Sequence, residues 1–299
     1  MRKVKKIMVD KVLKDYKTLI DKEIDRLFPM VDTEWYSEVI EASRYSLLLG
    51  GKRIRPIIML EFCKLFGGKV EDAIDFAIAL EMIHTYSLIH DDLPCMDNDD
   101  MRRGNPACHI KFGEDIALLA GDTLLTESFK IVSNAPVDDA KKVKAIGVLS
   151  SMAGLHGMIG GQVMDLSFEK KKPSLKELHA MYVKKTGCLI SAAAQIGTIL
   201  GGGSQEQIII AQNYALNVGL AFQIIDDILD ITGDQAVLGK PVGSDELNDK
   251  TTFVSLLGLE KARKTAKEMT DEALGLLSML DGNTDNLKEI TKYLLERKY

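Results

Sequence analysis

Apolar residues recur at spacings of three and four along most of the chain, which is the period of one face of an α-helix. Short β-branched runs lie inside these patterns, and no regular alternation of strands and turns is present. The pattern predicts helices over residues 11–27, 39–49, 57–66, 73–90, 117–132, 145–158, 187–200, 207–231 and 262–280.

Glycine-rich or proline-containing breaks separate the predicted helices. Residues 73–90 and 187–231 are apolar around most of the helix circumference, so we expect these helices at the centre of the fold. No linker or change of composition divides the chain. We therefore expect one all-α domain over residues 1–299, a bundle of ten or more helices. The breaks are Gly50-Gly51, Gly67-Gly68, Gly104-Asn105-Pro106, Gly160-Gly161, Gly201-Gly202-Gly203 and residues 232–249.

Composition and charge limit the classes of protein to which the chain can belong. Apolar residues make up 46% of the 299 positions, which is ample for one core. The net charge of −6, without a long basic stripe, argues against a nucleic-acid partner. The apolar stretch 190–200 carries Ser191, Gln195 and Thr198 and is too short for a membrane span. The four cysteines are scattered without a C-x-x-C pair, which favours a reducing compartment. Residues 1–17 read as a surface amphipathic helix, so we expect a cytoplasmic protein.

The most informative segment, residues 88–104, places five aspartates after an apolar run. On a straight helix, Asp91 and Asp97 would point in different directions. Pro94 weakens continuation of the helix, so the chain can turn back and bring Asp97 toward Asp91. Asp99 and Asp100 have no assigned role and fit a solvated surface.

A second acidic cluster closes the predicted helix 207–231. Gln223, Asp226, Asp227 and Asp230 stand at positions i, i+3, i+4 and i+7, which share one helical face. An isolated acid pair is usually a solvated face. These carboxylates interrupt an otherwise apolar helix, which favours a functional polar stripe because buried charges are paired or bind metals.

Divalent cations would stabilise both clusters. Neighbouring carboxylates repel one another, and both clusters lie near expected helix C-termini, where the helix dipole disfavours anions. Hard oxygen ligands without a cysteine or histidine cage favour Mg²⁺, with more than one ion shared with substrate phosphates.

Several basic and polar motifs are weak when taken singly. Residues 50–56 form a glycine turn opening a helix, with Pro56 as its first residue and Lys52 and Arg55 near a positive N-terminus. A solvated basic turn fits equally well, and the spacing excludes a nucleotide P-loop. His84 precedes Asp91 by seven residues on the same helical face. It fits either a hydrogen-bond donor to an anion or a core histidine. Two further weak motifs are Lys184-Lys185-Thr186-Gly187 and Gly160-Gly161-Gln162-x-x-Asp165.

In combination and order, these motifs closely resemble the trans-polyprenyl diphosphate synthases, nearest to the bacterial farnesyl diphosphate synthase branch. The likeness runs from about residue 45 to 257, and the pair of aspartate-rich motifs is highly specific. It rests on Lys52-Arg53-Ile54-Arg55-Pro56, Asp91-Asp92-x-x-x-x-Asp97 with Arg102-Arg103, Gln162-x-x-Asp165, Lys185-Thr186, and Gln223-x-x-Asp226-Asp227-x-x-Asp230.

The resemblance implies the isoprenoid synthase fold, an all-α bundle around a deep central cavity, in a homodimer that condenses isopentenyl diphosphate with allylic diphosphates. It implies that Asp91, Asp97 and Asp226 hold Mg²⁺, supported directly or through water by Asp92, Asp227 and Asp230. Lys185, Thr186 and Gln162 would be catalytic. The allylic diphosphate would contact Arg102, Lys185, Thr186, Gln223 and Lys240, and isopentenyl diphosphate would contact Lys52, Arg55, His84 and Arg103.

Product length is a separate question. Tyr86 lies five residues before Asp91, with Ser87 next to it. An aromatic at this position, with Pro94-Cys95 inside the acidic motif, resembles the floor that limits the product to farnesyl diphosphate. Alternatively, Tyr86 is only a core aromatic.

Three other functions remain open. A geranylgeranyl diphosphate synthase would differ only in product. A non-catalytic regulatory subunit would be expected to lose motif acids or arginines, and none is missing. A terpene cyclase would not need Lys52, Arg55 and His84.

Overall fold

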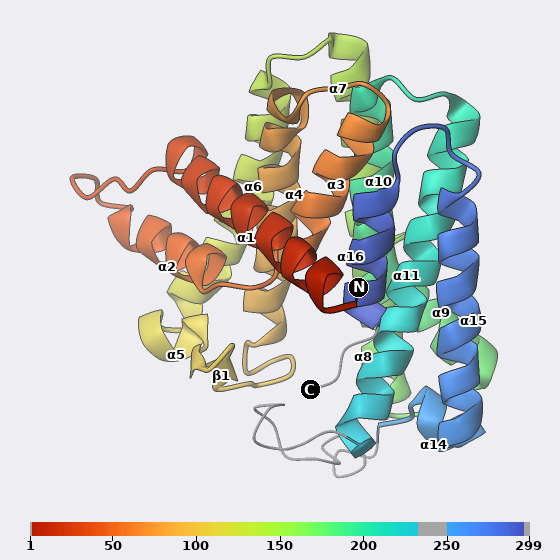
Figure 1. Cartoon of the computed structure of the whole chain (residues 1–299). Coiled ribbons are helices and arrows are strands. Elements are labelled where there is room, and N and C mark those ends of the chain that lie inside the picture. The colour runs from red at the N-terminus through yellow and green to blue at the C-terminus, as the bar shows by residue number, and fades with distance from the viewer. Residues whose placement is uncertain (1, 233–249, 296–299) are drawn as a thin grey trace.

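The computed structural model describes residues 2–232 and 250–295, and the described part is almost entirely helical (Figure 1). The all-α prediction is confirmed. The helices are α1 (Arg2–Leu27), α2 (Ser37–Leu48), α3 (Ile54–Leu65), α4 (Val70–Asp91), α5 (Cys108–Phe112), α6 (Glu114–Asn134), α7 (Asp139–Ala153), α8 (Met158–Phe168), α9 (Leu175–Tyr182), the π-helix η1 (Val183–Gly187), α10 (Cys188–Gly201), α11 (Gln205–Thr232), α14 (Phe253–Leu257), α15 (Leu259–Leu277) and α16 (Asp285–Leu295), with strands β1 (Met101–Arg102) and β2 (Asn105–Pro106).

Helices α4 and α10 form the centre of the bundle. Every residue of α10 from Cys188 to Leu200 is buried, and α10 packs on α3, α4, α7 and α11. Helix α4 packs on α3 and α6, with α1 and α2 outside it (Figure 1). The prediction of central helices is therefore confirmed for α4 and α10, whereas α11 is buried along one side only.

Several predicted boundaries were wrong. Gly160-Gly161 was read as a break, but both glycines lie inside α8, and the helix predicted to reach residue 158 ends at Ala153. Pro56 is the third residue of α3 rather than the first, because α3 begins at Ile54. The short helices α5, α9 and α14, the π-helix, the two-stranded hairpin and α16 were not predicted.

Two described helical segments are long and apolar enough to cross a membrane by length and composition alone, Asp139–Phe168 and Gln205–Thr232. The first is interrupted between α7 and α8, and the second carries the second acidic cluster. Core helices of soluble proteins pass the same test, so this is weak evidence for a membrane span.

The packing brings the two acidic clusters to one end of the bundle. Helices α4 and α11 both run toward the lower end of Figure 1, where α4 ends at Asp91 and α11 at Thr232. Residues 91 and 226, far apart in the sequence, therefore lie on the same cavity.

Candidate active site

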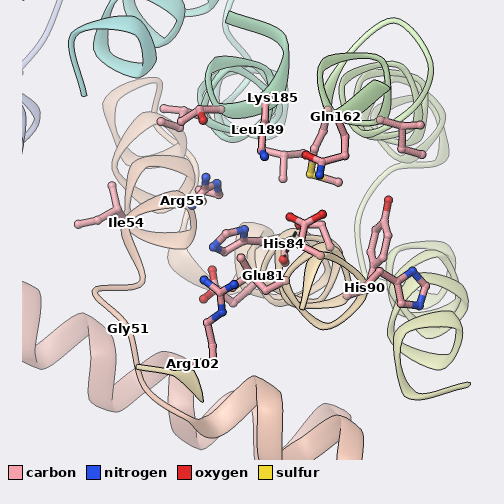
Figure 2. A pocket seen from close by; sticks show the side chains of 18 of the residues that line it. Gly51, Ile54, Arg55, Glu81, His84, His90, Arg102, Gln162, Lys185 and Leu189 are labelled. Atoms are coloured by element: carbon pink, nitrogen blue, oxygen red, sulfur yellow. Dashed lines mark hydrogen bonds between the residues drawn. The ribbon is translucent and has the colours of Figure 1, made fainter. Parts of the chain in front are cut away.

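A cavity of about 1230 Å³ is lined by both Asp91 and Asp226, and Figure 2 shows some of the side chains around it. In Figure 2, the side chains of Arg55, His84 and Lys185 point toward a common space. Most residues that the sequence singled out line this cavity: Lys52, Arg55, His84, Tyr86, Ser87, Asp91, Asp97, Arg102, Arg103, Gln162, Lys185, Thr186, Gln223 and Asp226. Asp92, Asp227 and Asp230 are not among its lining residues, and Lys240 lies outside the described residues.

The first acidic segment turns as expected. The helix ends at Asp91, and the backbone N–H of Asp97 donates to the carbonyl of Asp91 at 2.9 Å. A second turn bond joins Met96 N–H to the Leu93 carbonyl at 2.8 Å, on either side of Pro94. Because the chain doubles back, both carboxylates line the cavity. Burial, reinforced by the charge of Asp97, raises the pKa of Asp91 to about 6, although Lys185 opposes the shift.

Asp92 has a different environment from its neighbour. It is 2% exposed and accepts from the guanidinium of Arg102, with Nε at 3.1 and 3.0 Å from its two oxygens. Burial raises the pKa of Asp92 even though Arg102 opposes the shift. In this arrangement Asp92 orients Arg102 at the edge of the cavity instead of lining the cavity itself.

A tight hairpin separates the two adjacent arginines. Strands β1 and β2 pair with Arg102 opposite Asn105, and the turn residues Arg103 and Gly104 both have positive φ, 53° and 76°. Arg102 therefore reaches Asp92, while Arg103 reaches the carbonyl of Gly50 in the loop before α3. The two cations lie on different parts of the cavity wall, which supports separate roles for them.

The residues of the second acidic cluster also differ in their environments. Gln223 and Asp226 line the cavity. Asp227 is buried and accepts from Tyr182 Oη at 2.9 Å and from the Phe253 backbone N–H at 2.8 Å. Asp227 thus holds α9 and α14 against α11. Asp230 lies one turn farther along α11 and is half-buried.

The π-helix η1 brings two candidate site residues, Lys185 and Thr186, to the cavity. Lys185 Nζ pairs with Asp165 Oδ2 at 2.5 Å, and Thr186 Oγ1 donates to Gln223 Oε1 at 2.6 Å. Burial opposes the charge of Lys185, but Asp165, and then Asp91 and Asp97, raise its pKa. A π-helix is a wide, rare turn that is common at functional sites.

Glycines allow other helices to approach η1 closely. A Cβ atom at Gly161 of α8 would lie 2.2 Å from the backbone nitrogen of Lys185, and a Cβ at Gly219 of α11 would lie 2.5 Å from Gly187 Cα. Only glycine fits at these distances. Gly161 was interpreted from the sequence as a break, but it is a packing residue.

A group of cations forms the other side of the cavity. The Arg55 Nε is buried without a hydrogen-bond partner, and burial lowers the pKa of Arg55 to about 10. Burial and four nearby arginines hold the pKa of His84 well below its usual range: Arg55, Arg103, Arg102 and Arg53. His84 is therefore neutral and can donate one ring N–H among the cations. Such an excess of positive charge suits a polyanion.

Sequence reasoning missed two charged residues in this group. Arg53 and Glu81 both line the cavity and are joined by an ion pair of 2.8 Å. Glu81 precedes His84 by three residues and interrupts the apolar run 76–83, and this single acid was the available signal.

Tyr86 lines the part of the cavity between α4 and the neighbouring helices. Its ring is 6% exposed and makes an edge contact with His90, with centroids 5.7 Å apart. Its hydroxyl is buried without a hydrogen-bond partner, and burial, with the charge of Asp91, raises its pKa to about 12. Tyr86 thus presents a neutral ring to the cavity.

The carboxylates supply some, but not all, of the oxygen ligands that a hard divalent cation needs. Asp91, Asp97 and Asp226 supply oxygen ligands to one cavity. Among the described residues, no three acidic, histidine or cysteine side chains are close enough to enclose a metal ion by themselves. Mg²⁺ commonly completes its coordination with water and substrate phosphates, so this open arrangement fits an ion that is bound together with a diphosphate.

Comparison with known proteins identifies the family. The polyprenyl synthetase model matches residues 36–294. The chain belongs to the polyprenyl synthetase family, and it is a prenyltransferase. It is 46% identical to the farnesyl diphosphate synthase of Micrococcus luteus, over 87% of this chain and 90% of that protein.

Relatives with a different product are comparably similar. The chain is 43% identical to the large subunit 1 of the heterodimeric geranylgeranyl pyrophosphate synthase of Arabidopsis thaliana, over 89% of this chain and 72% of that protein. Among solved structures, a geranyltransferase from Helicobacter pylori in complex with magnesium and isoprenyl diphosphate superposes with a TM-score of 0.79 at 35% identity, covering 94% of this chain and 96% of that one. Family membership thus leaves the product length open.

Proposed function

We propose that this prenyltransferase is a farnesyl diphosphate synthase. It condenses isopentenyl diphosphate with dimethylallyl diphosphate, and then with geranyl diphosphate, giving (2E,6E)-farnesyl diphosphate and releasing diphosphate. The observation that carries the proposal is that carboxylates and cations from α3, α4, η1 and α11 meet on one cavity. We also propose that residues 1–299 act as one synthase domain.

Mg²⁺ is the cofactor that these residues suit, with more than one ion per site. Asp91, Asp97 and Asp226 would hold the ions together with substrate oxygens. Asp92 would support the ions by orienting Arg102, and Asp230 would support them through water. When bound, the ions neutralise the charge that develops on the departing diphosphate.

The allylic diphosphate is proposed to lie between η1 and the β-hairpin. Lys185 and Arg102 would bind its oxygens, and Thr186 and Gln223 would donate to it after exchanging the hydrogen bond that they share. Gln162 has a buried amide nitrogen without a partner, which supports a contact with substrate. Lys240, in the same proposed group, lies outside the described residues.

Isopentenyl diphosphate is proposed to bind the cations near the start of α3. Arg55 and Arg103 would pair with its phosphates, neutral His84 would donate a hydrogen bond, and Lys52 would contribute charge. The incomplete hydrogen bonding of Arg55 supports this assignment.

These placements account for the chemistry. The allylic C–O bond breaks as its electron pair leaves with the diphosphate, which the cationic side chains stabilise. The isopentenyl double bond attacks the allylic cation, and the new cation loses a proton to the departed diphosphate. The two diphosphate sites hold the substrates in position to react with each other, so no covalent nucleophile of the protein is needed. Leu189, Ile190 and Phe222 line the cavity and would keep water from the cation.

Tyr86, with Ser87, is proposed to limit the product to fifteen carbons. The buried ring on the cavity wall supports this role. A geranylgeranyl diphosphate synthase is the second candidate, because such enzymes are among the similar proteins. A regulatory subunit and a terpene cyclase are less favoured, since the acids and the isopentenyl site are all retained.

We also propose a cytoplasmic homodimer. Apolar side chains are exposed on α6 and α8, among them Leu118 at 47%, Leu119 at 49% and Val163 at 56%. Exposed apolar surface favours association. All four cysteines are free thiols, as expected in a reducing compartment. Sedimentation velocity should give twice the mass of the chain, and a monomer at micromolar concentration would contradict the dimer.

The test of function is a condensation assay. The protein is incubated with Mg²⁺, dimethylallyl diphosphate and labelled isopentenyl diphosphate, and the dephosphorylated products are separated by length. We expect a fifteen-carbon product that disappears when EDTA is added. A twenty-carbon product would favour the second candidate, and no condensation would exclude both.

A further inference from the structure

Glu81 is an acidic residue within the group of cations. It lies on α4, is 3% exposed and lines the cavity with Arg55 (Figure 2). Arg53 and Arg103 line the same cavity. A buried carboxylate must be paired, because burying an isolated charge is costly. Which cation pairs with Glu81 therefore decides which cations are left for a substrate.

Arg53 is the cation that pairs with Glu81. Its Nη1 donates to Glu81 Oε1 at 2.8 Å, and its Nη2 donates to the Leu47 carbonyl at 2.7 Å. Its Nε and Nη2 also reach Asp21 Oδ1 of α1 at 3.1 and 2.9 Å. The Arg53 side chain has no exposed surface, so it is committed to protein partners.

The two neighbouring arginines are not committed in this way. The Arg55 side chain makes no hydrogen bond to any residue that the structure describes, and the Arg103 side chain donates only to the carbonyl of Gly50. The charge of Glu81 nonetheless acts on Arg55 and Arg103. It raises the pKa of each arginine, although burial has the larger effect and lowers it. Glu81 is thus near enough to attract either arginine if its own partner were removed.

We propose that Arg53 is a positioning residue that occupies Glu81 and so keeps Arg55 and Arg103 available for the diphosphate of isopentenyl diphosphate. The inference rests on the function proposed above. Without Arg53, Glu81 would draw Arg55 or Arg103 into an ion pair, and the substrate would have to compete with a buried carboxylate for that cation.

A merely structural role for Arg53 predicts something different. Arg53 has φ of 52° immediately before α3, and its bonds to Asp21 and Leu47 also fix the loop. If this anchoring were its whole role, removing Glu81 in addition would not repair the loss of Arg53. If Arg53 acts by occupying Glu81, removing Glu81 as well restores the isopentenyl site. A double-mutant cycle separates the two roles.

The experiment compares Arg53→Gln, Glu81→Gln and the double variant by steady-state kinetics with geranyl and isopentenyl diphosphates. Arg53→Gln should raise the KM for isopentenyl diphosphate about tenfold or more, with the KM for geranyl diphosphate within about threefold of the unaltered protein. The double variant, which restores the net charge, should return the isopentenyl KM to within about threefold. A double variant no better than Arg53→Gln would overturn the proposal.

Glu81→Gln alone provides a second test if Arg53→Gln fails to fold. Because Arg53 already occupies Glu81 in the unaltered protein, Glu81→Gln should leave the KM for isopentenyl diphosphate within about threefold of the unaltered value, and a KM raised about tenfold or more would also overturn the proposal. Asp25→Asn is the matched control, since Asp25 lies on α1 like Asp21 but pairs with Arg44 at an exposed site. Failure of the proposed function would appear separately, as an absence of condensation product from the unaltered protein.

Discussion

At the scale of single residues, the site holds ionisable side chains in positions where burial disfavours their charged forms. Asp91 lies in a half-buried position beside Asp97, and its pKa is raised to about 6. Arg55 is buried with an unpartnered Nε. Such groups are costly in the free protein and become favourable when a ligand of opposite charge binds, which is characteristic of functional sites.

The raised pKa of Asp91 predicts a pH-dependent stability. The folded metal-free protein holds the Asp91 proton more tightly than the unfolded chain does, so this stabilisation is present at about pH 4 and is lost as the pH rises through about 6. Asp91→Asn should therefore be more stable than the unaltered protein at neutral pH, by roughly 1–3 kcal/mol, and about equal to it near pH 4. Urea denaturation in EDTA at both pH values measures this difference.

The control for this experiment is Asp100→Asn, a change to an exposed aspartate of the same loop. Because Asp100 is exposed, this change should alter the free energy of unfolding by about 0.5 kcal/mol or less. An Asp91→Asn protein that is less stable than the unaltered one at neutral pH would contradict the environment described for Asp91.

Tyr86 offers a second prediction at this scale. Replacing it with alanine removes a buried ring from the cavity wall, so Tyr86→Ala should yield prenyl diphosphates longer than fifteen carbons. Because the Tyr86 hydroxyl has no hydrogen-bond partner, Tyr86→Phe should leave the product length unchanged. Chromatography of the products decides between a floor and an ordinary core aromatic, which would leave the product of Tyr86→Ala unchanged.

At the scale of elements, the π-helix depends on glycines of its neighbours. It holds Lys185 and Thr186 at the cavity, and Gly161 and Gly219 let α8 and α11 approach its backbone. A side chain at either glycine would push η1 away from the cavity. The geometry of both catalytic candidates is therefore set by residues that do not themselves touch substrate.

We predict that Gly161→Ala lowers turnover by about 10–100-fold, because it displaces Lys185 and Thr186 while the bundle remains folded. Gly147→Ala is the matched control, since Gly147 is also helical and has open space around its Cβ position. Circular dichroism should show equal helicity for both variants. Full activity in Gly161→Ala would mean that η1 tolerates the shift.

The sequence predicted the elements that are long and periodic, and failed where tertiary packing sets the structure. The turn between Asp91 and Asp97 follows from Pro94, and it is present as predicted. The helix α8 was missed because Gly161 was interpreted by its local propensity as a break, whereas its close contact with η1 requires a glycine.

The partners of charged side chains could not be predicted for the same reason. The pairs Arg53–Glu81 and Tyr182–Asp227 join residues from distant parts of the chain. Nothing local distinguishes Asp227 from Asp226 as a metal ligand, and only the packing of α9 and α14 on α11 shows that Asp227 has other partners.

At the scale of the whole molecule, the bundle brings two acidic clusters onto one cavity. Asp91 ends α4 and Asp226 lies near the end of α11, and α10 packs against both helices. We propose that both clusters act on one substrate diphosphate. Neither cluster alone would then support the reaction.

The most direct test measures the turnover of Asp91→Asn and Asp226→Asn beside Asp100→Asn, with saturating Mg²⁺ and both substrates. Each of the first two variants should lose activity by about 1000-fold or more while the helical fold persists. Asp100→Asn, which removes the same charge from an exposed position, should stay within about threefold of the unaltered protein. Substantial turnover in either Asp91→Asn or Asp226→Asn would show that the two clusters do not act together on one diphosphate.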